Sequence, residues 1–163
     1  MLQTATDILD YLSSLYTEKG LWDPIEQSTL PNKYGNSFFA LACGLLYQET
    51  EEKKWESLAL KASIQELKNT KNRFHKIEMF RWEFKNYALL QLASKRVLPE
   101  LRKGLRSRIK NMQDMGSFRA NWMAMRGLNL LLRWELYQNA KDLKEAEKEI
   151  KKVLQRQTRE GLF

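Results

Sequence analysis

Residues 37–48 read SFFALACGLLYQ and residues 51–69 read EEKKWESLALKASIQELKN, and these two segments decide the predicted fold. The first is apolar on nearly every side, which is typical of a helix buried on most of its surface. The second is amphipathic at helical spacing. Its inward positions are Trp55, Leu58, Ala59 and Ala62, and its outward lysines are Lys54, Lys61 and Lys68. Together they predict a helical hairpin with one buried and one half-exposed helix.

The same alternation occurs twice more along the chain. An apolar segment at 84–96 precedes an amphipathic one at 99–112, and an apolar segment at 120–137 precedes an amphipathic one at 141–158. In the last segment Leu143, Ala146, Ile150 and Leu154 are the inward positions. A buried inner row covered by an outer row is how arrays of helical hairpins are built.

One more helix is predicted ahead of these pairs, at about 6–16. Thr6 suits its N-cap, and the apolar stripe is Ile8, Leu9, Leu12 and Leu15. Residues 21–35 contain two prolines and are expected to be irregular. The sequence therefore predicts an all-α protein, residues 1–163 forming a single domain of about seven helices with three inner/outer pairs.

An asparagine recurs near the start of each apolar segment. Asn36-Ser-Phe-Phe, Asn86-Tyr-Ala-Leu and Asn121-Trp-Met-Ala share this arrangement. Asparagine at a helix start caps free N–H groups, which gives the recurrence a structural explanation. The functional alternative is that one end of the inner helices lines a shared cleft, with the asparagines at its rim.

Composition excludes several kinds of function. One Cys rules out a disulfide framework and one His rules out most histidine metal sites. Cys43 lies in an apolar run and is expected to be a buried structural thiol. Phosphate-loop, nucleophile-elbow and zinc-protease motifs are missing, so no metal or cofactor is predicted. No stretch resembles a signal peptide or a membrane span, which predicts a cytoplasmic location.

Charge is distributed unevenly between the two ends of the chain. Residues 1–60 have a net charge of −5, and residues 61–163 have a net charge of +13. Arg102, Arg106 and Lys110 fall on one predicted helical stripe, which indicates a site for a polyanion such as an acidic polysaccharide or an acidic protein. The alternative is a solvated face without a partner. Nucleic acid is disfavoured because this stripe lacks interleaved aromatic residues.

Three segments carry a resemblance to a known family. WEFKNYALLQLA (82–93), RANWMAMRGLNLLL (119–132) and YGNSFFALACGLLYQET (34–50) resemble inner helices of the α/α toroids in polysaccharide lyases of the heparinase II/III and alginate lyase type. The terminal REGLF is similar to a lead into a further turn. The resemblance implies part of a toroid, a fragment of a longer chain. Two features depart from that family, which is usually exported and carries a second, β-rich domain.

The resemblance implies a carbohydrate-related function on an acidic polysaccharide. In such lyases an Asn or Arg neutralises a uronate carboxylate and a Tyr or His removes the C5 proton. Residues of these types are His75, Asn86, Tyr87, Asn121 and Arg126, and Trp22, Trp82 and Trp122 are candidates for stacking on sugar rings. Each has a structural alternative in the core or at a cap, so the sequence leaves catalysis open. The other function considered is a non-catalytic helical-repeat scaffold for an acidic protein.

An incomplete toroid would also leave apolar inner-helix surface uncovered at its open end. Exposed apolar surface favours association, so a homo-oligomer is expected.

Overall fold

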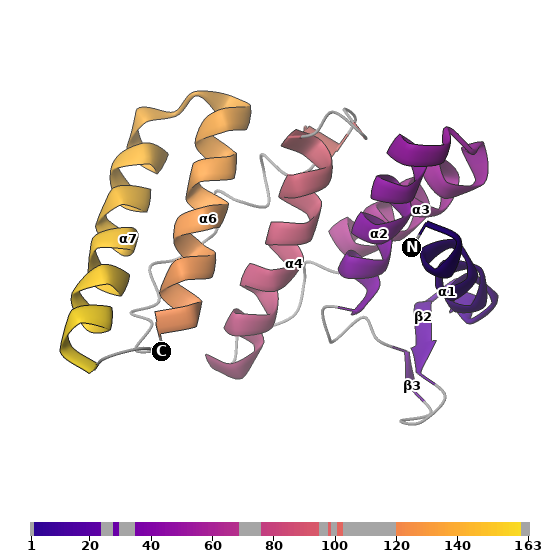
Figure 1. Cartoon of the computed structure of the whole chain (residues 1–163), viewed down its shortest axis with the longest axis horizontal. Helices are drawn as coiled ribbons and strands as arrows, with labels where there is room; N and C mark the ends of the chain where they lie inside the picture. Colours follow the sequence, from indigo (N-terminus) through magenta and orange to yellow (C-terminus); the bar gives the residue numbers. More distant parts are fainter. Residues whose placement is uncertain are drawn as a thin grey trace.

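The computed structural model describes residues 2–23, 28–29, 35–68, 76–94, 98, 101–102 and 120–160. Within these residues the protein is mainly helical, which confirms the predicted class at this level (Figure 1). The helices are α1 (Leu2–Ser14), α2 (Gly35–Thr50), α3 (Lys53–Lys68), α4 (Lys76–Ser94), α6 (Ala120–Tyr137) and α7 (Ala140–Glu160).

A small antiparallel sheet follows α1 and extends into residues 21–35, where the sequence predicted irregular structure. Its strands are β1 (Tyr16–Thr17), β2 (Gly20–Asp23) and β3 (Ser28–Thr29), in the order β1-β2-β3. Gly20 has a φ of 114°, a conformation that residues with a Cβ rarely adopt. The Thr17 hydroxyl donates to the Gly20 carbonyl at 2.8 Å and accepts from the Lys19 N–H at 3.2 Å. Strands this short have too few residues for an alternating pattern to appear.

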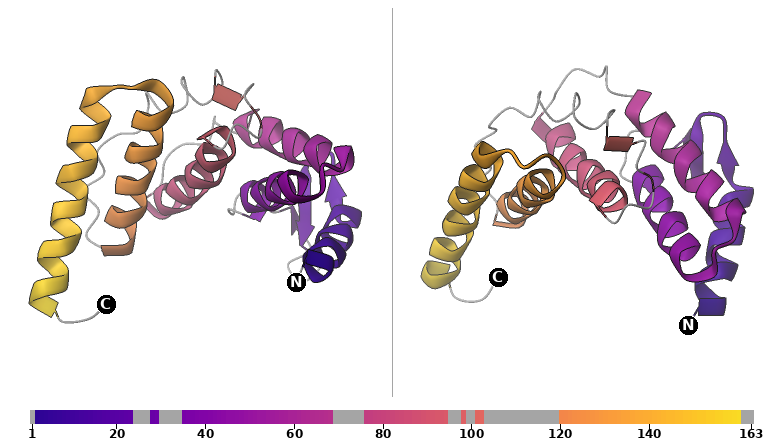
Figure 2. Two further views of the ribbon diagram at one scale, coloured as in Figure 1. Left: turned by 45° about the horizontal axis from the view of Figure 1, so that its top comes forward. Right: turned by 90° about the horizontal axis from the view of Figure 1, so that it is seen from above.

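The helices form an inner and an outer row. Helix α2 packs against α4 and α4 against α6, while α3 covers α2 and α7 covers α6. Figure 2 shows these helices along an arch, with α3 and α7 on its outer side. The predicted alternation of inner and outer helices is therefore confirmed for the first and third pairs. Of the outer helix expected at 99–112, only residues 101–102 are described, and both are helical.

Two hairpins use the same two-residue connection. Glu51 follows α2 with a φ of 57°, and Gln138 follows α6 with a φ of 53°. The Glu51 N–H donates to the Tyr47 carbonyl at 2.8 Å, and the Gln138 N–H donates to the Trp134 carbonyl at 2.7 Å. A left-handed residue that returns its N–H to the last turn is a common way to end a helix. The repeat thus extends from the helices to their turns.

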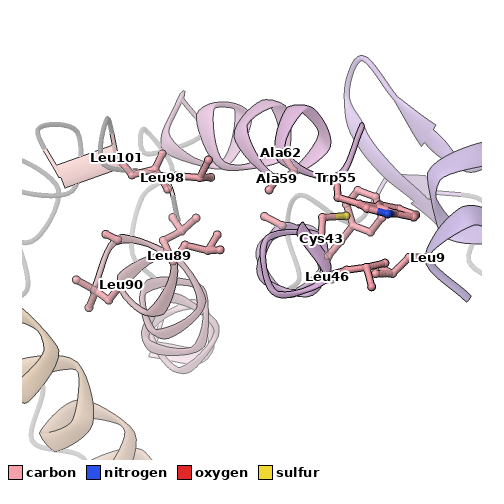
Figure 3. Packing of buried hydrophobic residues seen from close by; sticks show 14 residues of the cluster. Leu9, Cys43, Leu46, Trp55, Ala59, Ala62, Leu89, Leu90, Leu98 and Leu101 are labelled. Carbon is pink, nitrogen blue, oxygen red and sulfur yellow. The ribbon is translucent and has the colours of Figure 1, made fainter. Parts of the chain in front are cut away.

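The apolar core lies mainly among α2, α3 and α4 (Figure 3). Trp55 is fully buried beside Cys43 and Leu46, as its inward position in the sequence predicted. Helix α1 contributes only one fully buried residue, Leu9. The centre of the molecule is consequently better packed than its N-terminal helix.

Several predicted details are wrong at the two ends of the array. Thr6 is not an N-cap, because it lies inside α1 and its hydroxyl donates to the Leu2 carbonyl at 3.1 Å. Ile8, Ile150 and Leu154 were expected to face the core, yet all three are exposed. Among the described elements, α1 packs on α2 and α7 packs on α6, so part of each apolar stripe stays exposed.

Candidate functional site

A buried polar cluster joins the first three helices of the array. The Lys85 Nζ of α4 lies 2.9 Å from the Glu66 Oε1 of α3, and both side chains are buried. The Asn36 amide of α2 donates to the Glu66 Oε2 at 3.3 Å and to the Ala62 carbonyl at 3.1 Å. A buried ion pair adds little net stability, but breaking it is costly. The cluster therefore fixes how α2, α3 and α4 align.

A second cluster joins α4 to α6. The Asn129 amide donates to the Glu83 Oε2 at 2.6 Å and to the Glu83 carbonyl at 2.9 Å. The Arg126 guanidinium lies 3.8 Å from the Glu83 Oε1. Burial raises the pKa of Glu83 above its usual value, although the Asn129 hydrogen bond and Arg126 oppose this shift. The Glu83 carboxylate therefore links the two inner helices α4 and α6.

An ion pair continues the series between α6 and α7. The Arg133 Nη2 lies 3.3 Å from the Asp142 Oδ1, and both side chains are largely buried. Burial raises the pKa of Asp142, and the Arg133 guanidinium partly offsets that change. Buried polar links therefore join α2 to α3, α3 to α4, α4 to α6 and α6 to α7.

The recurring asparagines have different settings from those expected. Asn36 is buried in the first turn of α2 and bonds across to α3, so its amide is not a cap. Asn86 is also fully buried, and it lies in the middle of α4 because that helix begins at Lys76 rather than near Phe84. Asn121 is exposed, whereas Asn129 provides the buried amide of α6. The sequence signal for Asn129 was an Asn inside an apolar helix, between Arg126 and Arg133, and it was missed.

The candidate catalytic residues occupy dissimilar places. Asn86 is in the interior and Arg126 is largely buried against Glu83. Tyr87 is half-buried and Asn121 is on the surface, while His75 lies outside the described residues.

The candidate sugar-stacking and polyanion residues are described only in part. Trp22, Trp82 and Trp122 belong to β2, α4 and α6, and their side chains lie outside the described part of the structure. Arg102 is half-buried, and its carbonyl accepts a hydrogen bond from the Tyr137 hydroxyl at 2.6 Å. Arg106 and Lys110 fall outside the described residues, so the polyanion stripe remains a prediction.

Cys43 is chemically protected. It is fully buried in α2, and burial raises the pKa of its thiol to about 12. A reactive cysteine needs an accessible thiolate, which this environment disfavours. The predicted buried structural thiol is confirmed.

An open groove lies on the outer face of α3. It has a volume of about 650 Å³, and its lining residues are Glu18, Ser57, Leu60, Lys61, Ile64, Gln65 and Lys68. One edge is rigid, because the Tyr16 hydroxyl donates to the Gln65 Oε1 at 2.6 Å and the Gln65 amide donates to the Glu18 carbonyl at 2.6 Å. The Lys61 ammonium stands 5.1 Å from the centre of the Tyr16 ring.

The lysines of α3 differ in how they are paired. Lys54 lies 3.2 Å from the Asp10 Oδ1 of α1. Lys61 and Lys68 are exposed, and neither has a salt bridge to any carboxylate in the described ranges. The groove thus combines an apolar floor with two cations that are available to an anionic ligand.

Within the part of the chain that the structure describes, neither a metal-binding cluster nor a membrane-spanning helix is present. The Cys, His, Asp and Glu side chains of this part form no group of three or more that could hold a metal ion. Its helices include none with the length and apolar character of a membrane span.

No protein-family model matches this chain, and no curated protein or solved structure is significantly similar to it.

Proposed function

We propose that this protein is a non-catalytic helical-repeat scaffold that binds an acidic protein segment in the α3 groove. The observation that carries this proposal is the contrast between two sets of polar residues. Asn86 and Arg126 are held in the interior, whereas Lys61 and Lys68 are exposed beside an apolar floor. A scaffold is expected to keep such asparagine and arginine side chains packed, and a carbohydrate site is expected to expose them together.

The groove has the two components that a peptide site needs. Leu60 and the exposed Ile64 offer apolar surface for an anchoring side chain. The lysines attract carboxylates, which speeds association and selects against basic partners. Residues 57, 60, 61, 64, 65 and 68 recur at helical spacing along one face of α3, so an amphipathic helix with acidic flanks suits this surface.

The direct test is binding of a synthetic amphipathic helical peptide, with Leu residues on one face and Glu residues beside them. We expect the parent protein to bind it, with weaker binding as salt rises from about 0.1 M to about 1 M and the Debye length falls from about 10 Å to about 3 Å. The Lys61→Glu, Lys68→Glu double variant should bind at least about tenfold more weakly, a change of about 1.4 kcal/mol. Fluorescence anisotropy measures both effects.

The matched control is the Lys144→Glu, Lys148→Glu double variant on α7, which makes the same charge change away from the groove. Its peptide affinity should equal that of the parent. Equal affinity of the groove variant and the parent would exclude the groove as the site.

Carbohydrate recognition is the second candidate, and the arch of Figure 2 favours it. An arched row of inner helices is what a segment of an α/α toroid requires. On this hypothesis Tyr87, half-buried on α4, is the candidate base. Incubation with alginate or heparin should release unsaturated uronate, detected by its ultraviolet absorbance, and Tyr87→Phe should abolish that release.

The polyanion stripe gives this second candidate a binding test. On a heparin column the parent should elute at higher salt than the Arg102→Glu, Arg106→Glu, Lys110→Glu variant, because each lost cation weakens an electrostatic contact. Elution of both proteins at the same salt concentration would identify the stripe as a solvated face.

A further inference from the structure

Exposed apolar side chains are concentrated at the two ends of the helical array. Among the described residues, all the large exposed apolar side chains but Ile64 lie on α1, α6 or α7. Figure 1 places α1 and α7 at opposite ends of the molecule. Scattered apolar residues on a surface are ordinary, but contiguous apolar faces usually mark a contact.

The first of these surfaces, the α1 face, is formed by Ile8 and Tyr11. They are 55% and 61% exposed, and their spacing of three residues puts them on the same side of the helix. Asp7 is exposed next to them and gives this border its negative charge, whereas the other aspartate of α1, Asp10, is paired with Lys54 of α3. The α1 face is therefore apolar with an acidic border.

The second surface, the α6/α7 face, is formed by Leu128, Ile150 and Leu154. Leu128 is 46% exposed and Leu154 is 53% exposed. The two helices approach closely here, because a Cβ placed on Gly127 would lie 3.2 Å from the Ile150 Cγ1. Ile150 of α7 thus packs against the residue that directly precedes Leu128 in α6.

This second surface corresponds to the side on which an inner helix normally meets the next one. Helix α4 packs against α2 and α6, whereas α6 packs against α4 and its outer partner α7. Its border is basic on balance, since among the described side chains of α6 and α7 four lysines are exposed against two carboxylates: Lys141, Lys144, Lys148 and Lys151 against Glu135 and Glu147.

We propose that the α6/α7 face of one molecule binds the α1 face of a second copy. Both surfaces are apolar and their borders have opposite net charge, so the contact is complementary in both respects. Because the two surfaces differ, the contact is head-to-tail, and such contacts form a ring if the rotation closes or a filament if it does not.

Two single variants test this arrangement, each disabling one face. Tyr11→Glu disables the α1 face and Leu128→Glu disables the α6/α7 face. Both residues are exposed, so circular dichroism should show the parent's helical content. Sedimentation analysis of the parent should give a mass that rises with concentration. Each variant alone should stay monomeric, with association at least about tenfold weaker, which corresponds to about 1.4 kcal/mol.

Mixing the two variants is the decisive measurement. Each variant keeps the face that the other lacks, so an equimolar mixture should form a one-to-one heterodimer that grows no further. The control Glu49→Lys, an exposed position on α2, should associate like the parent. A monomeric parent at the highest concentration, a variant that still dimerises by itself, or a mixture without heterodimer would each overturn the proposal.

Discussion

At the scale of single residues, the protein places charged and polar groups where its helices meet. Glu66 and Lys85 form an ion pair inside the core, and Asn36 satisfies a further carboxylate oxygen. The core contains too little water to stabilise a lone charge, so each group depends on its partner. Removing one partner should therefore be worse than replacing both.

The first prediction concerns this pair. Lys85→Met should lower the free energy of unfolding by about 3–5 kcal/mol, because it leaves the Glu66 carboxylate buried without its cation. The double variant Glu66→Leu, Lys85→Met should regain most of that loss, since apolar replacements of a buried pair are often neutral. Urea unfolding measures both. A double variant no more stable than the single one would contradict this account.

The second prediction concerns alkaline pH. The pKa of Cys43 is raised from 9.0 to about 12, and that of Tyr16 is raised from 10.0 to about 12, mainly by burial. The unfolded chain releases these protons at lower pH than the folded protein. The stabilisation is therefore complete at pH values below the pKa values of these groups in the unfolded chain. It is lost as the pH rises towards their pKa values in the folded protein, by up to about 1.4 kcal/mol per pH unit for one group.

Urea unfolding at about pH 8 and about pH 11 measures this loss. The control is Cys43→Ala, which should reduce the pH dependence because only the Tyr16 contribution remains. Equal slopes for the parent and the control would show that the thiol does not take part.

At the scale of helices and turns, the repeat is visible in the connections. Glu51 and Gln138 each end an inner helix in a left-handed conformation, with φ values of 57° and 53°. This conformation brings the Cβ close to the following carbonyl oxygen and costs roughly 1–2 kcal/mol for most residues. Glycine avoids that cost, so these two positions are strained where a glycine would not be.

The third prediction follows from this strain. Gln138→Gly should raise the free energy of unfolding by about 0.5–1 kcal/mol, because relief of the left-handed strain exceeds the extra chain entropy of glycine. Lys144→Gly, inside α7, is the matched control and should lower it by about 1 kcal/mol. Thermal unfolding separates the two, and destabilisation by Gln138→Gly would argue against strain at the turn.

At the scale of the whole molecule, contacts run between successive helices and the core is off-centre. The buried apolar cluster is supplied mostly by α2, α3 and α4, and α1 adds only Leu9 as a fully buried residue. In such arrays stability is roughly a sum of each unit and its neighbours. Opening should therefore cost less at the ends than in the middle.

The fourth prediction is a gradient of amide hydrogen exchange. Amides of α2 and α4 should exchange most slowly, and those of α1 should exchange fastest among the helices, because few buried contacts oppose its opening. Hydrogen-exchange mass spectrometry on the whole chain measures this. Equal protection of α1 and α4 would indicate a single cooperative unit.

What the sequence determined by itself was the helical class and the alternation of inner and outer helices. Both depend on local patterns, since residues 37–48 are apolar on all sides and residues 53–68 have one apolar face. The burial of Trp55 and Cys43 followed from the same patterns. The width of the apolar face of a helix is set by its own sequence, so inner and outer helices can be distinguished without the tertiary structure.

Only the tertiary structure decided which polar residues meet. Glu66 and Lys85 are 19 positions apart in the sequence, and nothing local links them. Helix α4 begins at Lys76, so Asn86 lies in its buried middle and not at a helix start as expected. In α6 the buried amide belongs to Asn129 and not to Asn121. The exposure of the α6/α7 face could not be predicted from the sequence either. An apolar stripe indicates that a surface favours burial, but it does not indicate whether other residues of the same chain bury it.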